Sequence, residues 1–195
     1  MKTAIVSFHC DPDGGDYYAA CAQQLTADCR RLRLTHCIQA RPLGRDWISA
    51  VRAKPTFLLE MYYSLRAPFL WVDVDNRILS EPAEIDGLKC DWASVQKDSE
   101  LGIWDAVHYV GASARTEALL QEWKIRCDAE TVVGSHSLLA RLLQTAAIPG
   151  LHFQYLPQSY IHGPVITIGL AGTPSKAAYF DQRRHREGAA GAALR

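Results

Sequence analysis

Residues 69–79 read FLWVDVDNRIL, an apolar run that leads directly into two aspartates, Asp73 and Asp75. Five of the first six residues are apolar, which predicts a strand buried within a sheet. A carboxylate that begins where a strand is still covered loses hydration and needs a partner, and a divalent cation is the strongest one available. The two acids could therefore hold a metal, start a covalent phosphotransfer, or only end a strand as solvated carboxylates.

Strand-like and helix-like stretches alternate on both sides of this run. The stretches that predict strands are 3–8, 34–38, 68–74, 90–97, 106–113, 151–156 and 164–168. Helical spacing predicts helices at 16–31, 45–53, 54–65, 114–127 and 135–147. Asp16 and Ser135 are the expected caps of the first and the last of these helices, and Pro55 lies near the start of the third. This alternation predicts an α/β fold with a mostly parallel central sheet flanked by helices.

The bulk composition fits one soluble domain. The chain has 195 residues, of which 48% are hydrophobic, and its net charge is zero, so the totals show no footprint for nucleic acid or an acidic membrane. No apolar stretch is long enough to span a bilayer, and no signal peptide is evident. The six cysteines form no C-x-x-C pair, which favours reduced thiols in a cytoplasmic protein. We expect one domain at 1–176 and a frayed tail at 177–195.

Two acidic segments follow predicted strands. HCDPDGGD, at residues 9–16, follows the first strand, and Asp73 and Asp75 end the central one. In a parallel sheet, ligands bind at the carboxyl ends of the strands. We therefore expect both segments at one edge of the sheet, where together they form a site.

A phosphatase of the haloacid-dehalogenase type would also place D-x-D after a strand, with one acid as nucleophile and the other as acid and base. In this chain Asn76 and Arg77 follow the two acids, where that class usually has a Gly-Thr or similar pair. The motif also lies beyond residue 70, whereas that class has it near the start of the chain. Both features disfavour a phosphatase of this type.

The stretch KPTFLLEMYYSLRAPFLWVDVDNRILSEP, residues 54–82, resembles the central block of GT-A fold nucleotide-diphospho-sugar transferases. The positions that carry this resemblance are Lys54, Pro55, Phe57, Pro68, Trp71, Asp73, Asp75 and Pro82. Further similarity lies in the first strand, loop and helix (7–25), in a helix with a late tryptophan (113–127) and in a Leu-Pro-x-x-Tyr segment (156–166). The resemblance covers most of 3–176 and implies a single GT-A-like, Rossmann-like domain.

The resemblance implies metal-dependent transfer of a sugar from a nucleoside-diphosphate sugar, with a UDP-sugar favoured. Asp73 and Asp75 would bind Mn²⁺ or Mg²⁺ and the donor's ribose. A hard cation with oxygen ligands stabilises the charge that develops on the leaving diphosphate. Tyr17 would stack on the base, where the loop with His9 and Asp11 would also contact it, although core packing explains Tyr17 equally well.

Other roles follow less directly from the resemblance. Lys54 would reach a phosphate or order the D-x-D strand, unless it is only a solvated residue at a helix start. Many relatives place a late histidine on the metal, but PVITIGLAGTPSK contains none. His162 is the nearby substitute, unless it is only a solvent-facing histidine in a turn. Relatives also carry an acid where this chain has His136, which we consider a base, an acceptor contact or a capping residue. Asp105 is a candidate acceptor-side contact, unless it is only an aspartate at a strand edge.

The acceptor class remains open among glycan, protein, small metabolite and modified nucleic acid. The chain is short for this class, so the acceptor site could be minimal or shared with a second subunit of a homo-oligomer.

Two alternatives come from other classes. HCDPDGGD resembles the first motif of the DHH phosphoesterases, in which His9, Asp11 and Asp13 would bind Mn²⁺ ahead of a helix. Such a hydrolase needs an Asp-His-His element, which this chain lacks. Without the late metal histidine, the protein could also be a catalytically degenerate nucleotide-sugar binder or a partner subunit.

Overall fold

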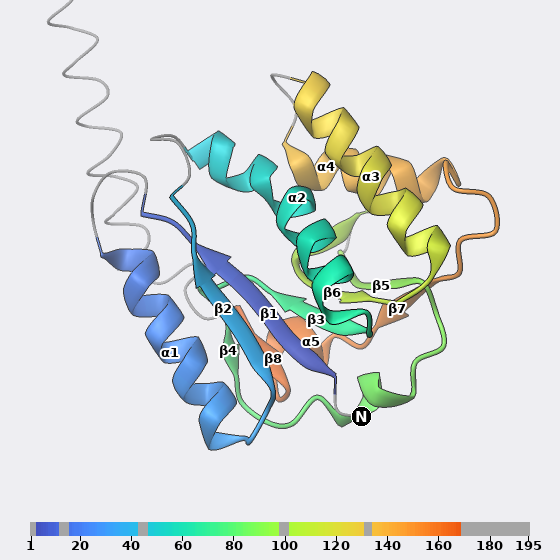
Figure 1. Ribbon diagram of the computed structural model, residues 1–195. Coiled ribbons are helices and arrows are strands. Elements are labelled where there is room, and N and C mark those ends of the chain that lie inside the picture. Colours follow the sequence, from blue (N-terminus) through green and yellow to red (C-terminus); the bar gives the residue numbers. More distant parts are fainter. Residues whose placement is uncertain (1–2, 12–15, 43–46, 98–101, 131–133, 169–195) are drawn as a thin grey trace, which may run out of the picture.

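The computed structural model describes residues 3–11, 16–42, 47–97, 102–130 and 134–168. These residues form a mixed α/β fold around a six-stranded sheet with the strand order β2-β1-β3-β6-β5-β7 (Figure 1). The strands are β1 (Ala4–His9), β2 (His36–Ala40), β3 (Phe69–Val72), β5 (Trp92–Gln96), β6 (Ile103–Val110) and β7 (Phe153–Leu156). Only β6 runs antiparallel to its neighbours within this sheet, which confirms the predicted mostly parallel arrangement.

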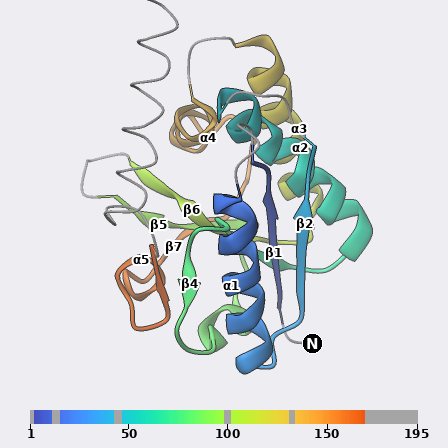
Figure 2. The same cartoon turned by 90° about the vertical axis from the view of Figure 1, so that its left-hand side faces the viewer.

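Helices cover both faces of the sheet. They are α1 (Tyr17–Arg31), α2 (Trp47–Leu65), α3 (Ala114–Ala129), α4 (Ser135–Gln144) and the short α5 (Ser159–His162), with a 3₁₀ turn at Ala83–Gly87. A second sheet pairs β4 (Arg77–Ile78) with β8 (Ile166–Thr167). Figures 1 and 2 show α2, α3 and α4 gathered over one face, while α1 lies on the other.

Two apolar cores form because successive side chains of a strand point to opposite faces. In β3, Phe69 and Trp71 pack in the core beneath α2, α3 and α4, whereas Leu70 and Val72 pack in the core that includes α1. All four side chains are buried. The central strand is therefore apolar on both faces, as its continuous hydrophobic run predicts.

Helix α2 corrects one prediction from the sequence. Residues 45–53 and 54–65 were expected to form two helices, but α2 runs unbroken from Trp47 to Leu65 with Pro55 in its interior. An interior proline costs about 3 kcal/mol because it removes a hydrogen bond and crowds the preceding turn. Phe57, Leu58 and Met61 bury the following turns against the sheet and offset this cost.

Smaller corrections concern element ends. Ser135 is the first residue of α4, and Gly134 holds the cap position predicted for Ser135. Strand β6 begins at Ile103, three residues before the predicted start at 106. The short elements β4, α5 and the 3₁₀ turn were not predicted, because two to five residues carry too little periodicity.

Gly111 lies where β6 ends, close to the backbone of the segment that leads into β5. A Cβ at this position would stand 2.5 Å from the carbonyl oxygen of Cys90 and 2.9 Å from that of Asp91. We expect Gly111→Ala to lower the free energy of unfolding by about 1–3 kcal/mol, because a rigid backbone must move to admit the methyl group. Gly87→Ala is the matched control, since a Cβ there meets nothing within 4 Å. Urea denaturation of both variants measures the effect, and equal midpoints would contradict the steric explanation.

The six cysteines are unpaired, in agreement with the prediction of free thiols. Among the helices that the structure describes, none combines the length and apolar character needed to cross a bilayer. The predicted tail at 177–195 lies outside the described residues, so the domain boundary at 176 stays a prediction.

Candidate functional site

Strand direction brings Asp73 and Asp105 to the same edge of the sheet. Asp73 follows the carboxyl end of β3, and Asp105 lies near the amino end of β6, which runs the opposite way beside it. The pairing continues past the strand, because the Asp73 backbone N–H donates to the Ala106 carbonyl oxygen at 2.8 Å. The antiparallel strand β6 thus adds a third acid to the two of the D-x-D motif.

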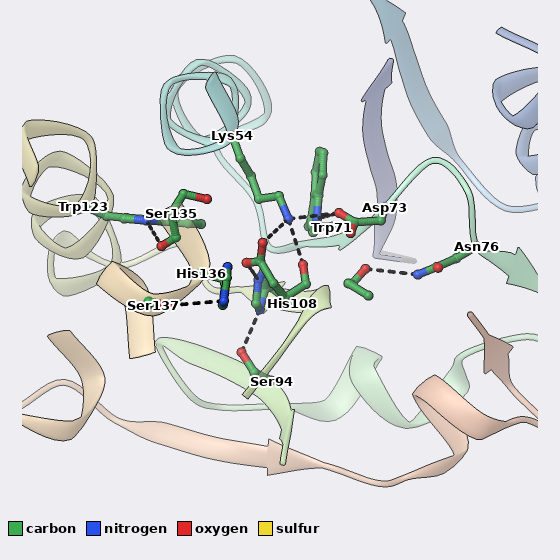
Figure 3. Close-up of polar contacts among 12 residues, drawn as sticks. Lys54, Trp71, Asp73, Asn76, Ser94, His108, Trp123, Ser135, His136 and Ser137 are labelled. Atoms are coloured by element: carbon green, nitrogen blue, oxygen red, sulfur yellow. Dashed lines mark hydrogen bonds and ion pairs between the residues drawn. The ribbon is translucent and has the colours of Figure 1, made fainter. Parts of the chain in front are cut away.

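Lys54 of α2 contacts both of these acids, and Figure 3 shows its side chain reaching toward Asp73. Its Nζ donates to Asp73 Oδ1 at 3.0 Å, to Asp105 Oδ2 at 2.6 Å and to the Asp105 carbonyl oxygen at 2.8 Å. The Lys54 side chain is only 6% exposed, while those of Asp73 and Asp105 are 33% and 19% exposed. Lys54 is therefore the centre of a buried ion-pair group and not a solvated residue at a helix start, and its contact with a phosphate stays a prediction.

A second set of polar groups continues from Asp105 into the core. His108 Nε2 lies 3.0 Å from Asp105 Oδ1, and His108 Nδ1 lies 2.7 Å from Ser94 Oγ. Ser94 also accepts a hydrogen bond from Trp92 Nε1 at 2.9 Å. His108 and Ser94 are completely buried.

A shift in strand register allows Asp105 and His108 to meet. Residues three apart in a regular strand point to opposite faces. The pairing of β5 with β6 shifts between Ser94 and Gln96, and such an irregularity re-aims side chains at the edge of a sheet. The shift places the Asp105 carboxylate on the same side as His108.

Charge and burial shift the pKa of each titratable group in this network. Burial opposes ionisation of Asp105, but Lys54 and His108 outweigh it and lower the pKa of Asp105 to about 2. The pKa of Asp73 is raised, mainly by burial and further by Asp105 and Asp75, although Lys54 acts in the other direction. Burial also lowers the pKa of His108, so its ring is neutral near pH 7. The pKa of Lys54 is raised because the two carboxylates outweigh its burial.

Asp75 and Tyr17 form the other side of the edge. Asp75 is 8% exposed, so this carboxylate is largely covered. Tyr17 packs against the core that includes α1, and its hydroxyl is buried. The pKa of Tyr17 is raised first by burial and then by Cys21 and Asp75, which places the hydroxyl in the electrostatic reach of Asp75. This packing fits the core explanation of Tyr17, and base stacking stays a prediction.

The loop after Asp75 is tied to α1. Arg77 donates to both carboxylate oxygens of Asp28, at 2.7 and 3.0 Å, and the Ile78 N–H donates to Asp28 Oδ2 at 3.2 Å. Asp28 is 2% exposed, so this is a buried, paired charge. Arg77 thus ties the segment after D-x-D to α1, whereas Asn76 Nδ2 donates to the Ala106 carbonyl oxygen of β6 at 3.2 Å.

Asp11, which was predicted to contact the base, caps α1. Its Oδ1 accepts from the Tyr18 N–H at 2.7 Å and its Oδ2 from the Ala19 N–H at 3.0 Å. Asp16 occupies the cap position that the sequence assigned to it, but its side chain makes no capping hydrogen bond. His9 Nδ1 lies 3.8 Å from Asp11 Oδ2. Contact of His9 or Asp11 with a nucleotide stays a prediction, and Asp13 lies outside the described residues.

The two aspartates at the start of α1 should differ in their effect on stability. We expect Asp11→Ala to lower the free energy of unfolding by about 1 kcal/mol, because it leaves two helix N–H groups without their acceptor. Asp16→Ala should change it by a few tenths, since no hydrogen bond is lost. Thermal unfolding of both variants compares the two positions, and a larger loss at Asp16 would contradict this assignment.

Within the described residues, the contacts of the two other predicted histidines are made outside this hydrogen-bonded network. His162 ends α5 and is exposed, and its ring lies edge-on to Trp104 with centroids 6.0 Å apart. His136 is exposed near the start of α4, where its Nε2 lies 3.1 Å from Ser137 Oγ. Across the described ranges, no group of three or more His, Cys, Asp and Glu side chains is arranged to hold a metal. The structure therefore does not assemble Asp73, Asp75 and His162 into one cluster, and their roles stay predictions.

The residues that the sequence did not single out are His108 and Ser94. Both are polar side chains within fully buried and otherwise apolar or aromatic stretches, 92–95 of β5 and 107–110 of β6. A buried polar group must find a hydrogen-bond partner, so such a position is a signal that could have been read from the sequence. The partners themselves could not, because they depend on how two strands, β5 and β6, pair with each other.

Solved structures that share this fold include glycosyltransferases of low sequence identity. One, described as involved in glycosylation of the major capsid of PBCV-1, has a TM-score of 0.64 and 11% identity over 90% of this chain and 98% of its own. The apo form of GlyE from Streptococcus pneumoniae TIGR4 has a TM-score of 0.56 and 14% identity over 82% of this chain. The bifunctional glycosyltransferase WbbM has a TM-score of 0.55 and 9% identity over 81% of it.

The last two proteins are longer, and this chain spans 46% and 39% of them. No protein-family model matches the sequence, and a search of curated proteins found no match. At these identities the likeness concerns the fold, and it gives no support to the phosphoesterase alternative. The chain shares its α/β fold with these glycosyltransferases.

Proposed function

We propose that this protein is a metal-dependent glycosyltransferase of the GT-A type, which uses a nucleoside-diphosphate sugar as donor. The observation that carries the proposal is the position of Asp73 and Asp75. Both follow the carboxyl end of the central strand, in a fold shared with glycosyltransferases. Ligands of open α/β sheets bind at this edge.

The residues present fit a divalent cation that is shared with a substrate. Among the described residues, Asp73 receives its side-chain hydrogen bonds from Lys54 and Trp71 on Oδ1 only, which leaves Oδ2 for a ligand. Lys54 pairs with Asp73 and Asp105, and Asp75 lies within the electrostatic reach of Asp73, so these three carboxylates outnumber the one lysine. Mg²⁺ is usually held by one or two carboxylates together with substrate phosphates and water. A two-carboxylate site without a third protein ligand is therefore adequate for a metal–diphosphate complex.

Each part of the site then has a defined task. Asp73 and Asp75 would hold Mn²⁺ or Mg²⁺, which when bound stabilises the negative charge of the leaving nucleoside diphosphate. Lys54 neutralises Asp73 and Asp105 and fixes the orientation of the Asp73 carboxylate. His136, exposed near the start of α4, is the proposed acceptor-side residue. UDP-sugars are the first donors to test.

A thermal-shift panel of nucleotide sugars, with and without Mn²⁺, tests the proposal. A ligand that binds only the folded state at 100 times its dissociation constant adds about 2.7 kcal/mol to the free energy of unfolding. For a chain of this size that raises the midpoint by about 5–11 °C. We expect a shift with a UDP- or other nucleoside-diphosphate sugar only when Mn²⁺ is present. The absence of a shift with every donor would reject the proposed function.

A further inference from the structure

A chain of hydrogen bonds runs from the core to Asp105, and its chemistry permits one arrangement of protons. The Trp92 indole can only donate, so Ser94 Oγ accepts from it at 2.9 Å. The ionised Asp105 carboxylate can only accept, so His108 Nε2 carries the proton of their 3.0 Å bond. The ring of His108 is completely buried, which disfavours a second proton on it. Nδ1 is therefore an acceptor, and the Ser94 hydroxyl donates to it at 2.7 Å.

At the Asp105 end of this chain of hydrogen bonds, the Lys54 ammonium is held in a fixed position. Its three N–H donors match three acceptors, namely Asp73 Oδ1, Asp105 Oδ2 and the Asp105 carbonyl oxygen. Trp71 Nε1 also donates to Asp73 Oδ1, at 2.9 Å. Both side-chain hydrogen bonds within the described part of the chain thus fall on one oxygen of Asp73, and the carboxylate cannot rotate without breaking them.

The surroundings of His108 show why this chain of hydrogen bonds is held rigidly. Its ring lies 5.2 Å from the Trp92 ring and 6.3 Å from the Trp123 ring, measured between centroids. Trp123 is itself anchored, since its Nε1 donates to the Ser135 carbonyl oxygen at 2.9 Å. The histidine is therefore confined by two large rings while both its nitrogens are hydrogen-bonded.

We propose that His108 and Ser94 are positioning residues for donor binding. Through Asp105 they hold the Lys54 ammonium on one oxygen of Asp73, which leaves the other oxygen for the metal–diphosphate complex. Asp105 thereby acts through Lys54, rather than as the acceptor-side contact that the sequence predicted. The inference rests on the proposed function, because the positioned oxygen has this task only if a donor binds there.

Two substitutions at one position separate positioning from packing. His108→Gln retains an amide N–H that can donate to Asp105, whereas His108→Phe fills the space but can neither donate nor accept. Residues that orient a metal ligand typically change metal affinity by 10–100-fold when they are replaced. We expect His108→Phe to weaken the binding of UDP in the presence of Mn²⁺ by about 10–100-fold and His108→Gln by less than about tenfold. His152→Phe makes the same change at an exposed histidine and should leave binding unaltered.

Isothermal titration of UDP with MnCl₂ into each full-length variant, well below its unfolding midpoint, measures this effect. A purely structural role would lower the midpoint of His108→Phe without changing the affinity of the folded protein. Wild-type affinity in folded His108→Phe would therefore overturn the inference while the proposed function stands. If wild-type protein binds neither UDP nor any other nucleoside diphosphate with Mn²⁺, both are overturned.

A smaller change keeps the test decisive if His108→Phe does not fold. Ser94→Ala removes only the hydroxyl that donates to Nδ1, and we expect it to weaken the same binding in the same direction. Nitrogen-15 NMR of the His108 ring reads the network without any donor. We expect the neutral Nε2–H tautomer near pH 7, and a ring protonated on Nδ1 would overturn the proposed chain of hydrogen bonds.

Discussion

Replacement of Lys54 with methionine is expected to lower the free energy of unfolding by about 3 kcal/mol, near the lower end of the range for breaking a buried ion pair. The methionine fits the volume of the lysine stem but leaves the Asp73 and Asp105 carboxylates without their shared counter-charge. The loss should lie at the lower end of that range because the Asp73 side chain is 33% exposed and keeps part of its hydration. For a chain of this size the unfolding midpoint should fall by about 6–12 °C.

The origin of that loss can be tested by removing one of the uncompensated charges. Lys54→Met combined with Asp105→Asn should recover part of the stability, because the asparagine oxygen still accepts from His108 without a buried charge. Lys124→Met is the surface control, since its ion pair with Asp128 is solvent-exposed and worth about 0.3–0.5 kcal/mol. Guanidinium denaturation compares the three proteins. Equal losses for Lys54→Met and Lys124→Met would show that the buried pair contributes little.

The sequence predicted the fold because its strongest signals are local. The apolar run before Asp73 specifies a covered strand, and the alternation of strands with helices specifies the α/β class. The edge at which Asp73 lies follows from the rule that parallel strands end together. Each of these inferences needs only a short window of residues and a general rule of architecture.

The chemistry around Asp73 could not be predicted in the same way, because it depends on contacts that are distant in sequence. Lys54 and Asp105 are separated by 51 positions, and Ser94 and His108 by 14. Asp105 reaches the site only because β6 is antiparallel and its register with β5 shifts near Ser94. Neither the strand direction nor the irregularity leaves a pattern in the sequence. Asp11 shows the converse, since a residue in an acidic loop serves as a helix cap instead.

Asp73→Asn should abolish donor binding without harming the fold. The asparagine oxygen can still accept from Lys54 and Trp71, so the hydrogen bonds of Oδ1 are retained while the charge is lost. Burial raises the pKa of Asp73, which means that the fold disfavours its ionised form and that ionisation reduces stability as pH rises above the usual carboxyl range. The neutral variant should therefore unfold at the same or a higher temperature near pH 7. Replacing a residue that only orients a metal ligand already lowers metal affinity or activity by about 10–100-fold. For the ligand itself we therefore expect Mn²⁺-dependent transfer to fall by more than about 100-fold.

This pairing of retained stability with lost activity is what distinguishes a functional carboxylate from a structural one. A carboxylate whose ionised form lowers the stability of the fold is retained by selection for function. Asp75→Asn should give the same loss of transfer, which can be followed by release of UDP from a UDP-sugar. Asp11→Asn serves as the opposing variant, because the phosphoesterase alternative places the metal there. If metal-dependent activity survived the substitution of Asp73 and of Asp75 but was lost in Asp11→Asn, the metal site would belong to the segment after β1. The transferase proposal would then fail.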